Sequence, residues 1–383
     1  MTDAERRARV ARRHLLAPEL RATAVVDVAD SLVALHSSDP ATVFLSIAAR
    51  MHRPSIAAIE RALYDGESLV RHHAMRRTLW VLPPDVAAAA HAGFTRKIAA
   101  AERRRGAKLV GLDDDAYADA VERAVATVVA ADGPTSTRDV AAALPDLTAG
   151  TVVNPGKRYE TTIAPHTRAL LQAAFEGRIV NGRPAGSWIS SQCVARWCAS
   201  PNVAWDRHDE VSGATDIVRR WLDRFGPGTL EDLTWWTGAT KTLVRRALDL
   251  IEPREVALEG HEDVGYVLAD DLDREPGTAP WVALLPGLDP TAMGWKQRGW
   301  YLSEDVAARV TDRNGNIGPT VWADGRIVGG WVQRPDGSVA HDADLTASQE
   351  TLLDAEIDRF RVFVGDTRTR PRFPAPNQAA LLG

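Results

Sequence analysis

The sequence predicts an α+β fold that is mainly α, with tandem winged-helix units followed by a small, β-rich, barrel-like C-terminal region. Three observations lead to this prediction. Amphipathic helices with basic faces are followed, three times along the chain, by a pair of short strand-like segments, which is the order of a winged helix. The phrase Gly-Pro-x-Thr at residues 226–229 echoes Gly133-Pro134-Thr135, so the layout repeats. After residue 280 apolar and polar residues alternate between Asn-Gly and Asp-Gly turns.

The composition is that of a soluble globular protein with several domains. The 383 residues are 45% hydrophobic and 25% charged. No apolar run is long enough to cross a membrane, the charged N-terminus is not a secretory signal, and two cysteines five residues apart suit a reducing cytoplasm. We expect winged-helix units at 1–84, 85–200 (with linking helices) and 201–275, and the β-rich region at 276–383.

The first unit contains a polar junction, His36-Ser37-Ser38-Asp39. A helical pattern over residues 22–35 precedes it. Asp39 followed by Pro40 predicts the next helix, because Asp accepts hydrogen bonds at the N-cap and Pro suits the first helical position. The junction is therefore expected at a helix–helix corner. By itself, the pattern indicates a capped turn with a satisfied histidine.

A basic hairpin is expected to complete the first unit. Residues 68–75 and 77–82 have the pattern of two strands closed by Pro83-Pro84. Alternation along the first strand predicts that one of His72 and His73 faces the core and the other the solvent. The hairpin side chains that we predict to contact DNA are Arg71, His72, Arg76 and Arg77.

The second and third units repeat this order. In the second we expect helices over residues 85–109, 115–131, 135–144 and 162–176 and a hairpin of 178–181 with 187–192. In the third we expect a helix over 214–225, a short helix capped by Thr229, a turn at Gly238, a helix over 240–251, and strands at 256–258 and 265–268. The helix over 240–251 has the place of a recognition helix. Its predicted DNA contacts are Lys241, Arg245 and Arg246.

In the C-terminal region, two tryptophans flank two cations. Trp295 and Trp300 enclose Lys296 and Arg298, and this mixture of rings and cations favours an exposed groove in which both cations bind DNA. By contrast, Trp235 and Trp236 suit the core of the third unit. A closing helix is expected over 348–364, followed by an exposed tail with Arg368, Arg370 and Arg372.

Several segments resemble a known family. LHSSDPATVFLS, RRTLWVLP, FGPGTLEDLTWWTG, LLPGLDPTAMGWKQRGWYL and DRNGNIGPTVWADGRIVGGW occur in this order in proteins similar to the AlkZ-like and YcaQ-like DNA glycosylases. The resemblance covers nearly the whole chain. It implies winged-helix domains, association with duplex DNA, and metal-free excision of bulky or crosslinked N-alkylated purines.

The resemblance also points to a catalytic corner. Characterised members have Gln-x-Gln or Gln-x-Asp where this chain has His36-Ser37-Ser38. This chain therefore departs from the family pattern, and Asp39 lies one residue beyond the motif. Altered chemistry, a different substrate, and DNA binding without catalysis are all open.

Hydrolysis of an N7-alkylpurine nucleotide needs little acid assistance, because the base already carries positive charge and leaves readily. The enzyme has to place a water near the anomeric carbon and stabilise an oxocarbenium-like sugar. We assign His36 as the general base, with an ordinary pKa near neutrality. Asp39 would orient the imidazole or favour the sugar's charge, and Ser38 would hold the water. We see no cofactor motif or metal-ligand cluster in the sequence.

Two other functions stay open. The same basic units suit a non-catalytic DNA-binding protein, such as a regulator or damage binder. The net charge of −5 suits a protein–protein scaffold instead. Our preferred prediction is a monomeric, DNA-binding, monofunctional glycosylase that acts on alkylated or crosslinked duplex DNA.

Overall fold

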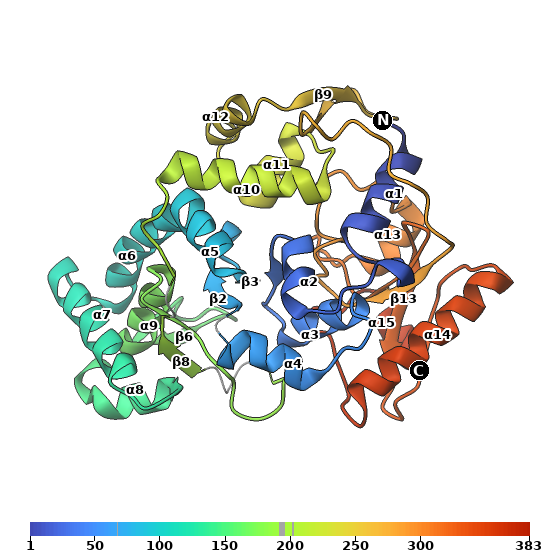
Figure 1. Cartoon of the computed structure of the whole chain (residues 1–383). Coiled ribbons are helices and arrows are strands. Elements are labelled where there is room, and N and C mark those ends of the chain that lie inside the picture. Colours follow the sequence, from blue (N-terminus) through green and yellow to red (C-terminus); the bar gives the residue numbers. More distant parts are fainter. Residues whose placement is uncertain (67, 191–195, 201–202) are drawn as a thin grey trace.

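The computed structural model describes residues 1–66, 68–190, 196–200 and 203–383 and shows a mixed fold in which helix predominates over strand (Figure 1). This agrees with the predicted α+β class. Helices α10–α12 form the upper part of the view, α6–α9 one lower lobe, and α1–α4 with the C-terminal sheet the other. No helix in these described ranges is long and apolar enough to cross a membrane.

The N-terminal segment forms helices around a three-stranded antiparallel sheet of order β1-β3-β2. The predicted helix over 22–35 is wrong in its second half. Helix α2 ends at Ser31, Val33 takes a left-handed φ of 60°, and the chain then pairs with β3. The elements are α1 (Asp3–Arg13), α2 (Val25–Ser31), β1 (Leu35–His36), α3 (Pro40–Ala49), α4 (Ile56–Glu60), β2 (Val70–His73) and β3 (Leu79–Leu82).

The next segment is a helical lobe with its own apolar core. A π turn (His91–Thr95) joins α5 to α6, so the predicted long helix over 85–109 is nearly continuous. Strand β7 pairs with β8 and not with residues 187–190 of the predicted partner strand, whose last two residues lie outside the described ones. The elements are α5 (Pro84–Ala90), α6 (Arg96–Val110), α7 (Asp114–Val129), β4 (Thr135–Ser136), α8 (Thr137–Ala143), β5 (Thr151–Val153), β6 (Thr161–Ile163), α9 (Pro165–Phe175), β7 (Ile179–Asn181) and β8 (Arg196–Ala199).

The third segment has the predicted order of helix, short helix, turn, helix and hairpin. Thr229 and Asp232 form a buried capping box at the start of α11, and Gly238 ends that helix with a left-handed φ of 70°. The elements are α10 (Glu210–Phe225), α11 (Leu230–Thr237), α12 (Lys241–Ile251), β9 (Arg254–Ala257) and β10 (Val264–Val267).

The C-terminal region is an open sheet, so the expectation of a barrel-like region is corrected. Its four antiparallel strands run in the order β11-β12-β13-β14, with no pairing between the first and last in the described chain. Asp324 and Gly325 both have positive φ and form the predicted tight turn. The elements are β11 (Val282–Leu285), α13 (Glu304–Val310), β12 (Thr320–Ala323), β13 (Arg326–Gln333), β14 (Val339–His341), α14 (Ala347–Val364) and α15 (Gln378–Leu382).

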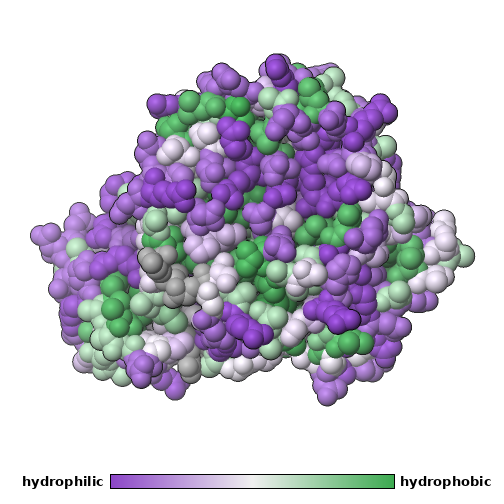
Figure 2. Space-filling view, in the orientation of Figure 1, coloured by the Kyte–Doolittle hydropathy of each residue, from purple (hydrophilic) through white to green (hydrophobic). Residues whose placement is uncertain are grey.

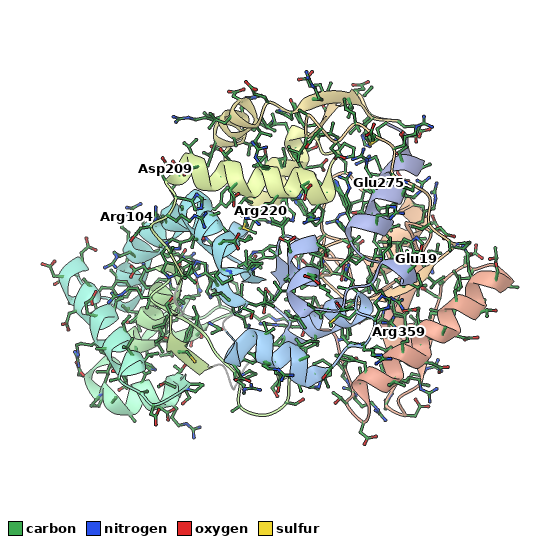
Figure 3. All side chains as sticks on the ribbon, in the orientation of Figure 1. Glu19, Arg104, Asp209, Arg220, Glu275 and Arg359 are labelled. Carbon is green, nitrogen blue, oxygen red and sulfur yellow. The ribbon has the colours of Figure 1, made fainter. Side chains whose placement is uncertain are left out.

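Helix α10 joins the segments. A Cβ at Gly213 would lie 2.5 Å from the Ala89 carbonyl oxygen, so glycine permits its close approach to α5. Arg220, labelled in Figure 3, binds Asp85 at 2.7 Å and lies 3.8 Å from Asp30, which ties α10 to α5 and the end of α2. One apolar core runs from α1 to the C-terminal sheet. The domain boundaries at 84, 200 and 275 stay predictions.

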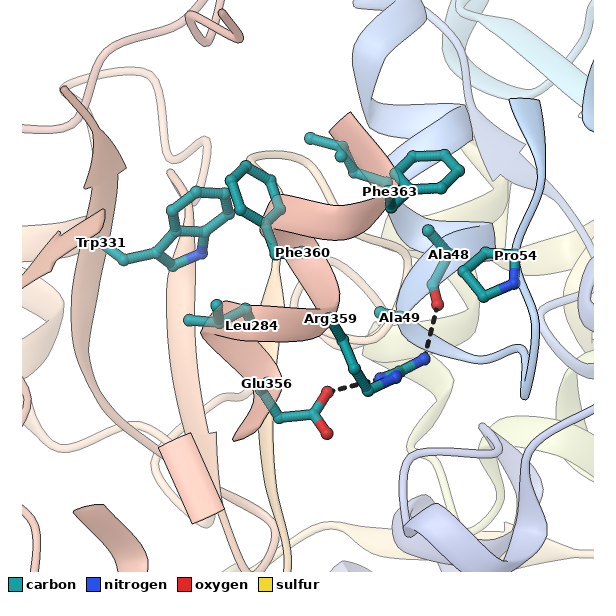
Figure 4. Close-up of a pocket in the computed structure, with 10 residues that line it drawn as sticks. Ala48, Ala49, Pro54, Leu284, Trp331, Glu356, Arg359, Phe360 and Phe363 are labelled. Carbon is teal, nitrogen blue, oxygen red and sulfur yellow. Dashed lines mark hydrogen bonds and ion pairs between the residues drawn. The ribbon is translucent and has the colours of Figure 1, made fainter. Parts of the chain in front are cut away.

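Two arginines, one half-buried and one fully buried, anchor α3, the helix that follows the polar junction. Arg359 of α14 binds Glu356 at 2.6 Å and the carbonyl oxygen of Ala48 at 3.2 Å (Figure 4). Arg50, the C-cap residue of α3, and Asp289 form a fully buried bidentate ion pair of 2.9 and 2.8 Å. Asp289 therefore has a structural partner. These contacts hold α3 against the C-terminal region.

Candidate functional site

The polar junction lies at the end of a strand and at the start of a helix. His36 pairs with Trp80 of β3, and the Ser37 amide donates to the Leu79 carbonyl at 2.9 Å. The chain then turns into α3, with Asp39 as N-cap and Pro40 at its first position, as predicted. The junction is therefore held by the sheet on one side and by the helix on the other.

Asp39 acts as a helix cap. Its Oδ1 accepts from the Ala41 amide at 3.1 Å and its Oδ2 from the Arg372 amide at 3.0 Å. The side chain is buried, and burial raises its pKa despite these two bonds. Because both oxygens are bound to backbone amides, Asp39 does not orient His36 in this structure. The capped-turn interpretation describes Asp39 well.

His36 is half-buried and packs its ring against the edge of Trp80, with 5.1 Å between centroids. Its Nδ1 is buried and has no hydrogen-bond partner among the described residues. Burial first, and then the positive charge of Arg76, lower the pKa of His36 to about 4. The imidazole is therefore neutral at neutral pH. It can accept a proton, but it is a weaker base than a histidine with the near-neutral pKa expected from the sequence.

A cleft of about 320 Å³ opens beside the two serines of the junction. The Ser37 hydroxyl accepts from Arg71 Nε at 3.2 Å, and the Ser38 carbonyl accepts from Arg372 Nη1 at 2.7 Å. Arg71, Arg77 and Arg372 all line the cleft. His36 is not among its described lining residues. The cleft thus brings hydrogen-bond donors and positive charge to Ser38, while the His36 ring packs against Trp80.

A second cavity of about 530 Å³ adjoins the cleft, since Arg71, Asn181 and Pro184 line both. The Nδ2 atom of Asn181 is buried without a hydrogen-bond partner in the described part of the chain. Donors therefore dominate the shared wall, which suits an anionic or carbonyl-bearing ligand. Sequence reasoning missed Asn181, because nothing in its segment distinguishes it, and it placed Arg372 only in an exposed tail.

The predicted hairpin contacts divide between core and surface. His72 is 1% exposed, and its Nε2 lies 3.1 Å from His91 Nδ1. Its side chain therefore cannot reach DNA, and we exclude it from the proposed contacts. The neighbouring His73 is half-buried, so neither histidine points fully to solvent. Arg76 and Arg77 are exposed, and the latter forms an ion pair with Glu102 at 3.2 Å.

The predicted contacts on α12 are exposed and lie in a different segment from the cleft. Lys241 and Arg245 line a groove of about 410 Å³, to which Glu231 and Asp263 also contribute. Arg246 is exposed as well. On the face seen in Figure 2, hydrophilic residues dominate the part over α10–α12, with smaller apolar patches among them. The two acidic residues offset the positive charge of this groove, so it suits an anion less well than a wholly basic surface would.

The exposed groove expected around Trp295 and Trp300 is absent from the described structure. These side chains are only 1% and 3% exposed, and the Trp295 ring packs on Phe225 of α10 at 5.3 Å. A segment without periodicity wraps here around an aromatic core, a contact that spacing alone cannot reveal. Lys296 remains exposed, and Arg298 is half-buried. Among the described residues, no group of His, Cys, Asp and Glu is placed to hold a metal ion.

Comparisons with known proteins give a consistent result. A family model described as DNA glycosylase AlkZ-like matches residues 29–363. The interstrand DNA cross-link repair glycosylase of Streptomyces sahachiroi is 28% identical over 175 residues, which are 42% of this chain and 45% of that protein. The match thus spans less than half of that relative. The solved structure of Streptomyces sahachiroi DNA glycosylase AlkZ has a TM-score of 0.73 at 19% identity, covering 97% of this chain and 99% of that one. It shares the fold.

Proposed function

This chain belongs to the AlkZ-like DNA glycosylase family, and from that premise we propose that it hydrolyses the N-glycosidic bond of alkylated purines in duplex DNA, including crosslinked DNA. The observation that carries the proposal is the family match over residues 29–363. The name of the Streptomyces sahachiroi relative supports crosslinked DNA as the substrate. We further propose that the three helix-and-hairpin units act as winged helices, with β2–β3 and α12 toward the duplex.

The chemistry proposed for the polar junction relies on His36 and Ser38. An N7-alkylpurine leaves with its charge neutralised, so the main needs are a placed water and a proton acceptor. Neutral His36 is the proposed acceptor, and because its Nδ1 is buried, the proton would have to reach its other ring nitrogen. Ser38 lies in the donor-lined cleft, where it can hold the water or the sugar. Asp39 contributes by fixing the start of α3 and not by proton transfer.

The second candidate function is DNA binding without base release. Two observations favour it: the junction lacks the Gln residues of the characterised members, and the lowered pKa of His36 makes it a weak base. A regulator or damage binder would keep the cationic cleft and lose the chemistry. We rank it second, because the family model that matches residues 29–363 describes DNA glycosylases.

Base release from a duplex containing N7-alkylguanine tests these functions. We expect release by the wild type, loss of release in His36→Ala and Ser38→Ala with duplex binding kept, and partial or full release in His36→Gln, which restores the family residue. His52→Ala is the matched control, because His52 is exposed and lies outside the junction. Equal release by wild type and His36→Ala would exclude the assignment of His36. Tight binding without release from any adduct would establish the second function instead.

A further inference from the structure

Two arginines from distant parts of the chain meet on one tryptophan, and one of them, Arg76, also acts on His36 through its charge. The guanidinium carbon of Arg76, in the β2–β3 turn, lies 4.8 Å from the ring centroid of Trp235 on α11. That of Arg298, in the C-terminal region, lies 5.3 Å from the same ring. Arg76 is exposed, Arg298 is half-buried and Trp235 is half-buried. The indole ring therefore holds two like charges together through cation–π contacts.

Neither arginine of this pair has a counter-charge in the described part of the chain. Arg298 donates only to neutral acceptors, the carbonyl oxygens of Trp295 and Gly315 at 3.2 Å and the Met293 sulfur at 3.6 Å. For Arg76, no acidic group of the described residues counters the effect of burial and of Arg298 on its pKa. The two charges repel, and after burial the charge of Arg298 is what lowers the pKa of Arg76. A bound anion would relieve this repulsion.

The backbone around Arg76 is built to deliver this side chain. Arg76 and Arg77 both have left-handed φ values, 57° and 61°, which non-glycine residues rarely adopt in succession. The conformation sends Arg77 to the cleft and Arg76 to Trp235. The Arg76 stem also packs against the turn after α11, where a Cβ at Gly238 would lie 2.9 Å from its Cγ. Local strain kept in this way is typical of functional sites.

We propose that Arg76 and Arg298, stacked on Trp235, form a phosphate site that grips one DNA backbone phosphodiester. This inference rests on the proposed action on DNA and deepens it by naming a contact that would position the target nucleotide. Planar guanidinium groups suit phosphate oxygens better than ammonium groups do. Both arginines are positioning residues, because the phosphodiester they bind is not the bond that breaks.

The test is binding of unmodified duplex to the full chain over a range of salt concentrations. Loss of one phosphate contact lowers the slope of log K against log salt by about 0.9, which is roughly eightfold in affinity at 0.1 M salt. We expect this in Arg76→Gln and Arg298→Gln, and no larger loss in the double variant because both grip one phosphate. Arg76→Lys should restore part of the affinity. Arg123→Gln is the control, since Arg123 is already paired with Asp146 at 2.8 and 2.7 Å.

Two results would overturn the phosphate site. One is that Arg76→Gln keeps the affinity and the salt slope of the wild type. Because Arg76 is exposed, its replacement should leave the fold intact, and an unchanged melting temperature would verify this. The other is that inorganic phosphate raises the melting temperature of the wild type but not of the variants, while the variants keep wild-type affinity for DNA. That result would assign the site to free phosphate. Base release is not the readout. Failure of the wild type to bind DNA at all would instead count against the proposed function.

Discussion

The buried pair of Arg50 and Asp289 leads to the sharpest stability prediction. Both side chains are fully buried. Arg50 donates five hydrogen bonds, two to Asp289 and one each to the His14 carbonyl, the Ser46 carbonyl and the Thr291 hydroxyl. Replacing Arg50 with Met keeps much of the volume and removes all five. It also leaves the Asp289 carboxylate buried without a cation.

We expect Arg50→Met to lower the free energy of unfolding by about 3–5 kcal/mol, the range for breaking a buried ion pair from one side. The Asp289→Leu change alone should have a similar effect, because it leaves the guanidinium uncompensated. The double variant Arg50→Met/Asp289→Leu should lose less than the sum of the two, because it leaves no unpaired charge. The coupling should therefore be several kcal/mol, on the order of 3.

Urea unfolding followed by both tryptophan fluorescence and far-UV circular dichroism measures these differences. Arg53→Met is the matched control, since Arg53 is exposed, and its effect should stay within about 0.5 kcal/mol. A loss below about 1 kcal/mol in Arg50→Met, or strictly additive effects in the double variant, would refute the reasoning. Because α3 begins at the polar junction, Arg50→Met should also weaken base release if the junction is catalytic.

Three further predictions concern three histidines with a lowered pKa, one glycine and one helix cap. Burial lowers the pKa of three histidines to about 4, so below pH 6.5 the unfolded chain binds more protons than the folded chain. Stability should therefore fall as the pH drops from 6.5 toward 4, by up to about 3 kcal/mol per histidine. Measuring the free energy of unfolding across this pH range checks the prediction, and a flat profile would contradict it. The three histidines are His36, His73 and His91. A Cβ at Gly106 would lie 2.3 Å from the Tyr117 hydroxyl, so Gly106→Ala should destabilise the fold by about 1–3 kcal/mol in thermal unfolding. At Gly277 a Cβ would meet open space, so Gly277→Ala should be close to neutral in the same assay. Thr229→Ala removes the buried cap of α11 and should lower the melting point, with a loss of about 1–2 kcal/mol; an unchanged melting point would show that the cap is dispensable.

Local chemistry made much of the fold predictable. The cap at Asp39 with Pro40, the cap at Thr229 and the turn at Gly238 all appear where the sequence placed them. Each depends on contacts within a few residues, so a single segment contains the whole signal. The C-terminal sheet was expected as a barrel, and it is open, because closure depends on which strand meets the last one. Alternation along strands carries no such information.

The candidate site shows the same division. The sequence alone identified the junction at His36, Ser38 and Asp39, the basic turn at Arg76, and the family to which the chain belongs. Only the tertiary structure decided that both Asp39 oxygens bind backbone amides. It also decided that burial makes His36 a weak base and that Arg76 meets Arg298 on one tryptophan. Residue type and short-range spacing determine local conformation, whereas burial and charge at a site arise from segments hundreds of residues apart.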